Sequence, residues 1–181
     1  ICINGAGSIG ALATWSASKI LNFVITNTSR SIRIEWCKNM GATHVVDHHK
    51  NLKEQLSPLG IIVDYVFICY STKKYLPIAK VIVKPLGRIV SIVEVEEALP
   101  FTKISKALSF SWEFMFAKSM HAFYMQSWSV ILNRIADLTD SGVVQQTVTK
   151  TLQFFRQGLQ TAHRKVQSGK VIIKITLNMS K

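Results

Sequence analysis

The most constraining feature of the sequence is a glycine-rich turn at residues 5–10, which reads Gly-Ala-Gly-Ser-Ile-Gly. It follows the apolar residues 1–3 and precedes a segment with the composition of a helix. A strand, a G-x-G-x-x-G turn and a helix in this order are typical of a dinucleotide-binding domain. In such a turn Gly5 permits the tight bend, Gly7 lets the backbone approach a pyrophosphate, and Gly10 lets the helix pack closely on the strand. A tight strand–helix turn without any ligand is the alternative.

The remainder of the chain alternates short apolar runs with longer helix-forming segments. Predicted strands cover residues 1–4, 22–26, 43–46, 61–69, 88–93 and 108–112. Predicted helices cover residues 8–20, with Ile9 and Leu12 among the apolar contacts, then 31–40, 52–56, 73–83 and an amphipathic 125–140. This alternation implies βαβ units. We therefore predict an α/β fold, a Rossmann-type doubly wound parallel sheet with helices on both faces.

The stretch after the second predicted strand bears on which dinucleotide would bind. It contains Ser29, Arg30 and Arg33, and it has no acidic residue before Glu35. NAD sites usually place an acid there to accept hydrogen bonds from the ribose hydroxyls. A hydroxyl and guanidinium groups instead suit a 2′-phosphate, which an acid would repel. The pattern favours NADP(H), although both arginines would also suit the solvated first turn of a helix.

The charge balance keeps a second class of function open. Lys and Arg total 22 and Asp and Glu total 10, so the formal net charge is +12. A basic surface attracts polyanions. However, the basic residues are dispersed, and the chain has no RNA-recognition or zinc-finger signature, which disfavours nucleic acid without excluding it. A basic Rossmann-like module that binds nucleic acid or a protein partner without catalysis is the alternative, and a non-catalytic structural remnant is a third.

Cysteine, histidine and hydropathy patterns exclude several other classes. No apolar run reaches the roughly 18 residues of a membrane span. Cys2, Cys37 and Cys69 have no spacing of a zinc site or a disulfide framework, which is typical of buried thiols in a reducing cytoplasm. The adjacent His48 and His49 lack a ligand spacing and are interpreted as structural or solvated. We therefore predict a cytoplasmic protein with no metal site among these residues.

Residues 34–50 read Ile-Glu-Trp-Cys-Lys-Asn-Met-Gly-Ala-Thr-His-Val-Val-Asp-His-His-Lys, and segments 63–67, 87–93, 111–116 and 168–170 extend the same pattern. Together with the glycine turn, they resemble the medium-chain dehydrogenase/reductase superfamily. The resemblance is strongest to its zinc-type alcohol dehydrogenase-like branch, close to the quinone oxidoreductases. It implies hydride transfer between NADPH and a quinone, enone or carbonyl/alcohol substrate, and it implies a homodimer.

The resemblance also implies which residues hold the cofactor. Gly7, Ser8, Ile9 and Gly10 would lie at the pyrophosphate, and Ser29, Arg30 and Arg33 at the 2′-phosphate. Others would lie at strand ends, beside the nicotinamide or in the pocket: Cys69, Tyr70, Ser71, Ile92, Val93, Phe114, Phe116 and Lys170. For the residues of this last set, the alternative role is ordinary core and loop packing. For Lys170 the alternative is a cation that follows a helix C-terminal glycine and interacts with the helix end.

The same resemblance divides the chain in two. Residues 1–141 would form the NADP-binding Rossmann domain, and residues 142–181 would belong to a GroES-like catalytic domain whose main part is absent. Within the second segment we predict a helix around Leu159 and Val166 and a strand at 171–177. Zinc would enter only through the absent part, and the catalytic residues are unassigned. We expect this chain alone to be inactive, and Ile173, where the family usually has glycine, suggests a divergent member.

Overall fold

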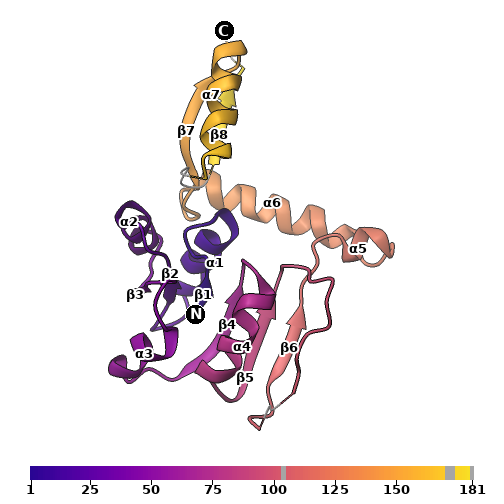
Figure 1. Ribbon diagram of the computed structural model, residues 1–181. Helices are drawn as coiled ribbons and strands as arrows, with labels where there is room; N and C mark the ends of the chain where they lie inside the picture. Colours follow the sequence, from indigo (N-terminus) through magenta and orange to yellow (C-terminus); the bar gives the residue numbers. More distant parts are fainter. Residues whose placement is uncertain (103–104, 170–173, 180–181) are drawn as a thin grey trace.

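The computed structural model describes residues 1–102, 105–169 and 174–179. Its main feature is a six-stranded, all-parallel sheet in the order β3-β2-β1-β4-β5-β6 (Figure 1). Its strands are β1 (Cys2–Ile3), β2 (Ile25–Asn27), β3 (His44–Val46), β4 (Val63–Ile68), β5 (Val83–Ser91) and β6 (Ser109–Trp112). The order is that of a Rossmann sheet. The chain adds strands toward one edge from β1 to β3 and toward the other edge from β4 to β6, so the strand order reverses between β1 and β4. The predicted α/β fold is confirmed.

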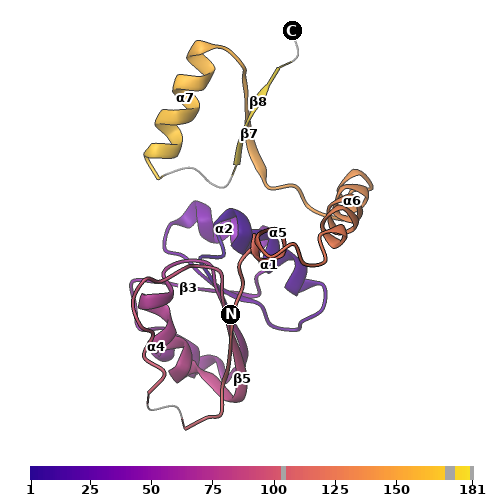
Figure 2. The same ribbon diagram turned by 90° about the vertical axis from the view of Figure 1, so that its right-hand side faces the viewer.

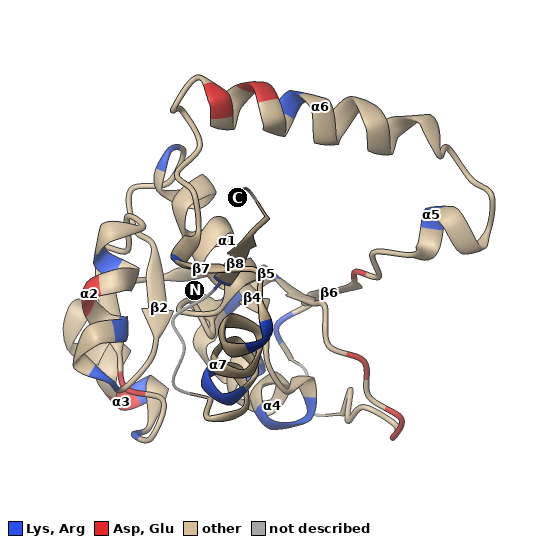
Figure 3. Cartoon of the chain, turned by 90° about the horizontal axis from the view of Figure 1, so that it is seen from above, with Lys and Arg blue, Asp and Glu red and all other residues tan. Residues whose placement is uncertain are grey.

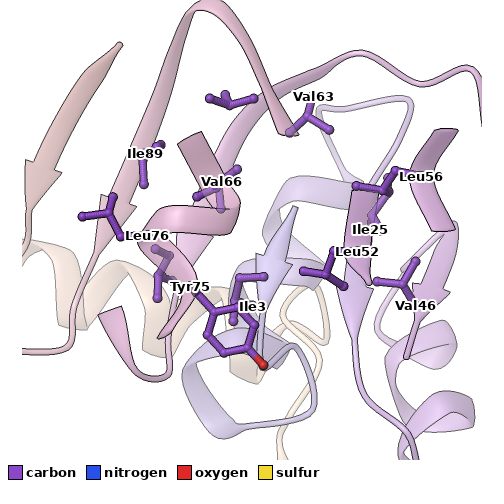
Figure 4. Packing of buried hydrophobic residues seen from close by; sticks show 13 residues of the cluster. Ile3, Ile25, Val46, Leu52, Leu56, Val63, Val66, Tyr75, Leu76 and Ile89 are labelled. Atoms are coloured by element: carbon purple, nitrogen blue, oxygen red, sulfur yellow. The ribbon is translucent and has the colours of Figure 1, made fainter. Parts of the chain in front are cut away.

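Helices connect the strands and continue beyond β6. They are α1 (Ser8–Ser18), α2 (Ser31–Asn39), α3 (Leu52–Leu56), the 3-10 turn η1 (Ser57–Leu59), α4 (Thr72–Ile82), α5 (Ala117–Met120) and α6 (Gln126–Asp140). The main core joins α3 and α4 to the sheet, with Leu56, Leu76 and Ile89 among its buried side chains (Figure 4). A smaller cluster of Ala6, Cys37 and Ala42 involves α2. Apolar contacts to different sets of helices are typical of a doubly wound sheet.

Helix α1 packs differently from the prediction. Ile9 and Leu12, expected to make apolar contacts, are 54% and 39% exposed. The buried residues are instead Gly10, Ala11 and Thr14, and the Thr14 hydroxyl donates to the Gly10 carbonyl oxygen at 2.7 Å. Small side chains face the glycine turn because the helix approaches the turn too closely for larger ones.

Two strand boundaries also differ from the prediction. Strand β2 ends one residue later than expected, at Asn27, because Asn27 still pairs with Val46 of β3. It also begins later, at Ile25, and Phe23 lies 57% exposed outside it. Strand β5 begins at Val83 rather than at the predicted residue 88. A shift in its register with β4 and a positive φ of 62° at Leu86 absorb the bend within one strand.

The C-terminal segment forms a separate β–α–β unit. Strands β7 (Val148–Gln153) and β8 (Lys174–Asn178) pair in parallel, and α7 (Arg156–Gln167) connects them (Figures 1 and 2). Lys170, Ile173 and the start of the predicted final strand lie outside the described residues. This unit contacts the start of α2, where Arg30 and Arg33 both donate to the Gly169 carbonyl oxygen, at 3.4 and 2.8 Å.

Helix α6 is amphipathic as predicted, but its apolar stripe is exposed in this chain. Ile131, Leu132 and Ile135 are 51%, 59% and 47% accessible. No helix in the described part of the chain combines the length and apolar character that crossing a membrane requires.

Candidate functional site

A crevice of about 540 Å³ lies where the first two strands of the sheet end. The glycine turn, the start of α2, the loop after β3 and the start of α4 form its walls. The lining residues are Asn4, Ala6, Gly7, Ser8, Asn27, Thr28, Arg33, His48, His49, Tyr70, Lys74 and Tyr75. In open α/β sheets ligands bind beyond the carboxyl ends of the strands, at the point where strand order reverses.

The geometry of the glycine turn explains its three glycines. The left-handed residue is Asn4, with φ 65°, and its carbonyl oxygen accepts from the Gly7 N–H at 3.0 Å. The tight bend predicted for Gly5 is therefore made by Asn4. Gly5 is required for another reason, since a Cβ there would lie 2.5 Å from the Cβ of Thr26 on β2. A Cβ on Gly10 would overlap the Asn4 carbonyl oxygen, so Gly10 does allow the close packing that the sequence predicts.

The N-terminus of α1 faces this crevice with no local anion to balance it. Gly7 is the N-cap, no described side chain caps the first turn, and that turn contains no acidic residue. Backbone N–H groups and the positive end of the helix dipole at such a terminus favour phosphate. Gly7 also keeps the crevice open, because a Cβ there would come within 2.8 Å of the Asn4 side-chain nitrogen.

Asn27 is a site residue that the sequence reasoning missed. Its side chain is 4% exposed, and its Oδ1 accepts from the Asn4 N–H at 2.6 Å. Its Nδ2 is buried and has no hydrogen-bond partner among the described residues. A buried N–H donor without a partner is costly, by about 1–3 kcal/mol. Because Asn27 lines the crevice at the end of β2, its Nδ2 is suited to an oxygen atom of a ligand.

The crevice carries positive charge and no carboxylate among its described lining residues. Arg33 from α2, Lys74 from α4 and the two histidines after β3 all line it. Burial and the neighbouring Arg30 charge lower the pKa of Arg33. Asp47 lies next to His48, but its carboxylate accepts from the His49 backbone N–H at 2.9 Å. An arrangement of this kind favours an anionic ligand.

The structure brings only some of the predicted site residues into this crevice. Gly7, Ser8, Arg33 and Tyr70 line it. Gly5 and Gly10 are buried beneath the turn, and Ile9 lies on the exposed side of α1. Ser29 is half-buried outside the lining, while Arg30 contacts Gly169.

The remaining predicted residues lie along the ends of β4, β5 and β6. Cys69 is half-buried beside Cys2, and a hydrogen bond to Cys2 together with burial raises the pKa of its thiol. Ser71 is the N-cap of α4. The Val93 carbonyl oxygen accepts from the Thr72 hydroxyl at 2.5 Å, next to the half-buried Ile92. Phe114 and Phe116 stack edge-to-face at 5.6 Å beyond β6, each about half exposed.

One group of described residues has the composition of a metal site. The ligand atoms of Asp47, His48 and His49 all lie within 4.8 Å of one another. Three consecutive residues do not provide the four tetrahedral ligands of a structural zinc site. Lys74 and Arg33 also lie near enough to lower the pKa of His48, and such cations oppose a bound divalent ion. The group does not fit zinc.

The strand order and the glycine turn at the first crossover define a Rossmann-type dinucleotide-binding fold. Comparison with known proteins then gives the family. The profile of the zinc-binding dehydrogenases matches residues 40–177. The chain therefore belongs to the zinc-binding dehydrogenase family, within the medium-chain dehydrogenase/reductase superfamily.

Individual relatives agree with this assignment. The chain is 34% identical over 182 residues to a zinc-type alcohol dehydrogenase-like protein of Staphylococcus aureus, covering 99% of this chain and 54% of that protein. The crystal structure of a protein assigned as a zinc-dependent alcohol dehydrogenase from Rhizobium etli superposes with a TM-score of 0.85 and 29% identity. That match covers 99% of this chain and 54% of that one. The chain thus spans about half the length of these relatives.

Two further structures share the fold at lower identity and contain nicotinamide cofactors. A mycobacterial protein complexed with NADPH matches with a TM-score of 0.73 and 16% identity, over 98% of this chain and 55% of that one. An Escherichia coli alcohol dehydrogenase complexed with NADH matches with a TM-score of 0.75 and 19% identity, over 98% and 51%. Proteins of this fold therefore include complexes with either nucleotide.

Proposed function

We propose that this chain is the NADP(H)-binding part of a medium-chain oxidoreductase. The enzyme would transfer hydride between NADPH and a quinone, enone or carbonyl/alcohol substrate. The observation that carries the proposal is the crevice at the end of β2, which combines the buried donor of Asn27 with Arg33 and has no carboxylate among its described lining residues. NAD sites place an acid at this strand end, and an acid would repel a 2′-phosphate.

The residues of the crevice suit successive parts of the cofactor. The N–H groups that begin α1 at Gly7 and Ser8 would hold the pyrophosphate. Asn27 Nδ2 would donate to the adenosine ribose or its phosphate, and Arg33 would pair with the 2′-phosphate. The bound nicotinamide would supply the hydride, since that chemistry belongs to the cofactor. The chain's own residues would orient it and shield it from water.

We also propose that residues 142–181 belong to a catalytic domain whose other part would supply the substrate site and any zinc. Supporting this division, β7 and β8 form their own sheet, and the chain spans about half the length of its relatives. We further propose a homodimer, supported by the exposed edge strand β6. A cytoplasmic location is supported by the free state of all three cysteines.

The alternative role in nucleic-acid binding has less support. Lys and Arg occur on α2, α4 and α7 and are not gathered along one element (Figure 3). A contiguous basic face would be the observation that favours a polyanion.

Calorimetric titration of the full 181-residue chain with NADPH and NADH tests the proposal. We expect NADPH to bind more tightly, without quinone reduction by this chain alone. Arg33→Ala should weaken NADPH binding by roughly 10–100-fold, because a hydrogen bond to a charged group contributes about 1.5–3 kcal/mol. NADH binding should change little.

Arg134→Ala is the matched control, because Arg134 lies on the exposed helix α6, outside the crevice. It should leave both affinities unchanged. Absence of binding by either nucleotide would refute the proposed function, and tighter binding of NADH would refute the specificity.

A further inference from the structure

The lining of the crevice contains a pair of histidines that the proposed function leaves unused. His48 and His49 follow β3, which lies next to β2 in the sheet, and their ring centroids lie 4.0 Å apart with the ring planes tilted by 39°. Both line the same cavity as Asn27, Arg33 and Lys74. The pair therefore faces the end of the crevice where the 2′-phosphate would lie.

The surroundings of His48 disfavour its charged form. Burial and the adjacent His49 lower its pKa, the Lys74 and Arg33 charges lower it further, and only Asp47 acts in the opposite direction. Tyr70 and Tyr75 are the other titratable groups that line the cavity. An imidazole beside two permanent cations is a group that gains a proton once an anion offsets their charge.

Side chains from three separate elements converge here, which adjacency in sequence does not explain. Arg33 comes from α2, the histidines from the loop after β3, and Lys74 from the first turn of α4. Gathering like charges costs free energy unless a counter-charge is present. A phosphate monoester dianion is a counter-charge of suitable size, and the unpartnered Asn27 Nδ2 supplies a neutral donor at the same place.

We propose that His48 and His49 complete the 2′-phosphate site, so that binding of NADP(H), but not NAD(H), takes up a proton. This inference rests on the proposed function and specifies how the phosphate is recognised. The sign follows from linkage, because a dianion raises the histidine pKa and the complex then binds more protons than the free chain. NADP(H) affinity therefore falls as pH rises through the interval between the free and bound pKa values. One linked histidine sets the limit at about tenfold per pH unit.

The experiment measures proton uptake by calorimetry with the full chain. Titrations with 2′,5′-ADP, 5′-AMP, NADP⁺ and NAD⁺ are run at one pH near 7 in PIPES and in Tris, whose ionisation enthalpies differ. A phosphate monoester has its second pKa at about 6, so the ligand phosphate stays largely doubly charged there. We expect uptake of a substantial fraction of a proton with 2′,5′-ADP and NADP⁺, and none with 5′-AMP or NAD⁺.

Histidine variants identify the side chain that takes up the proton when the ligand binds. The double variant His48→Gln with His49→Gln should lose the uptake and bind 2′,5′-ADP about equally at pH 6.8 and 8.0. Each single variant shows which ring carries the proton and also covers the case in which the double variant fails to fold. His121→Gln is the control, because His121 is exposed at the end of α5. It should keep the full uptake.

The outcomes separate this inference from the proposed function. Tighter binding of NADP⁺ than NAD⁺ without proton uptake overturns the inference and leaves the proposed function standing. Undiminished uptake in the histidine variants also overturns it. Failure of both NADP⁺ and 2′,5′-ADP to bind overturns the proposed function itself.

Discussion

Replacing Asn27 with aspartate tests the specificity reasoning with the smallest possible change in shape. The new carboxylate keeps the acceptor that now binds the Asn4 N–H at 2.6 Å, and it replaces only the buried, unpartnered Nδ2. The variant therefore removes a donor and adds a negative charge at the end of β2. This is the charge that NAD sites use to bind the ribose hydroxyls.

The expected loss of NADPH binding free energy in Asn27→Asp has two contributions. Loss of a donor to a charged group costs at least about 1 kcal/mol. Repulsion between the carboxylate and a doubly charged phosphate is roughly 3 kcal/mol, for a separation of about 6 Å and an effective dielectric constant of about 40. The sum of ~4 kcal/mol corresponds to a roughly 10³-fold weaker NADPH complex. NADH should bind equally well or more tightly, so the preference reverses.

Calorimetric titration of the wild-type and Asn27→Asp chains with both nucleotides measures the change. Thermal unfolding checks that the variant is folded. Asn133→Asp, on the exposed surface of α6, is the matched control and should leave the ratio of the two affinities unchanged. If the folded Asn27→Asp chain keeps its ratio within threefold of wild type, Asn27 does not face the 2′-phosphate and the reasoning fails.

Three further predictions concern stability and reactivity. Gly10→Ala should lower the free energy of unfolding by about 1–3 kcal/mol, because its Cβ meets the Asn4 carbonyl. Gly10→Ala should also weaken NADPH binding. Gly142→Ala is its control: Gly142 has φ +73° and open space around it, so this change should lower the free energy of unfolding by about 1–2 kcal/mol and leave NADPH binding intact. Leu76→Ala removes a fully buried side chain and should cost ~2–5 kcal/mol in urea unfolding; a loss below 1 kcal/mol would contradict the core assignment. Burial raises the pKa of the Cys37 thiol, so iodoacetamide at pH 8 should label it only in the unfolded chain, as mass spectrometry would detect.

Local sequence patterns were sufficient to predict the architecture of the fold. Alternating apolar and helical segments predicted the parallel sheet because each strand and helix is specified mainly by residues close together in sequence. The close packing at Gly10 was predictable for the same reason, since the turn and the helix are adjacent along the chain. The acid-free stretch that contains Arg33 was also visible without a structure.

Tertiary structure decided which side chains share the crevice. His48 lies in the loop after β3, Lys74 in α4 and Asn27 at the end of β2. No periodicity relates these three residues, so only the sheet order brings them together. Asn27 was missed because pairing of β2 with β3, rather than the apolar run itself, extends the strand to that residue.

The same limit applies to the residues that sequence reasoning overvalued. Ile9 and Leu12 looked like core contacts, yet the close approach of α1 to the glycine turn leaves room only for small side chains. In the same way, no local pattern predicted that Arg30 and Arg33 both donate to the Gly169 carbonyl oxygen, 139 and 136 residues away along the chain. The sequence by itself determined the fold and predicted a dinucleotide as its ligand. Long-range packing alone decided the individual contacts, because they join residues whose separation in the chain carries no local signal.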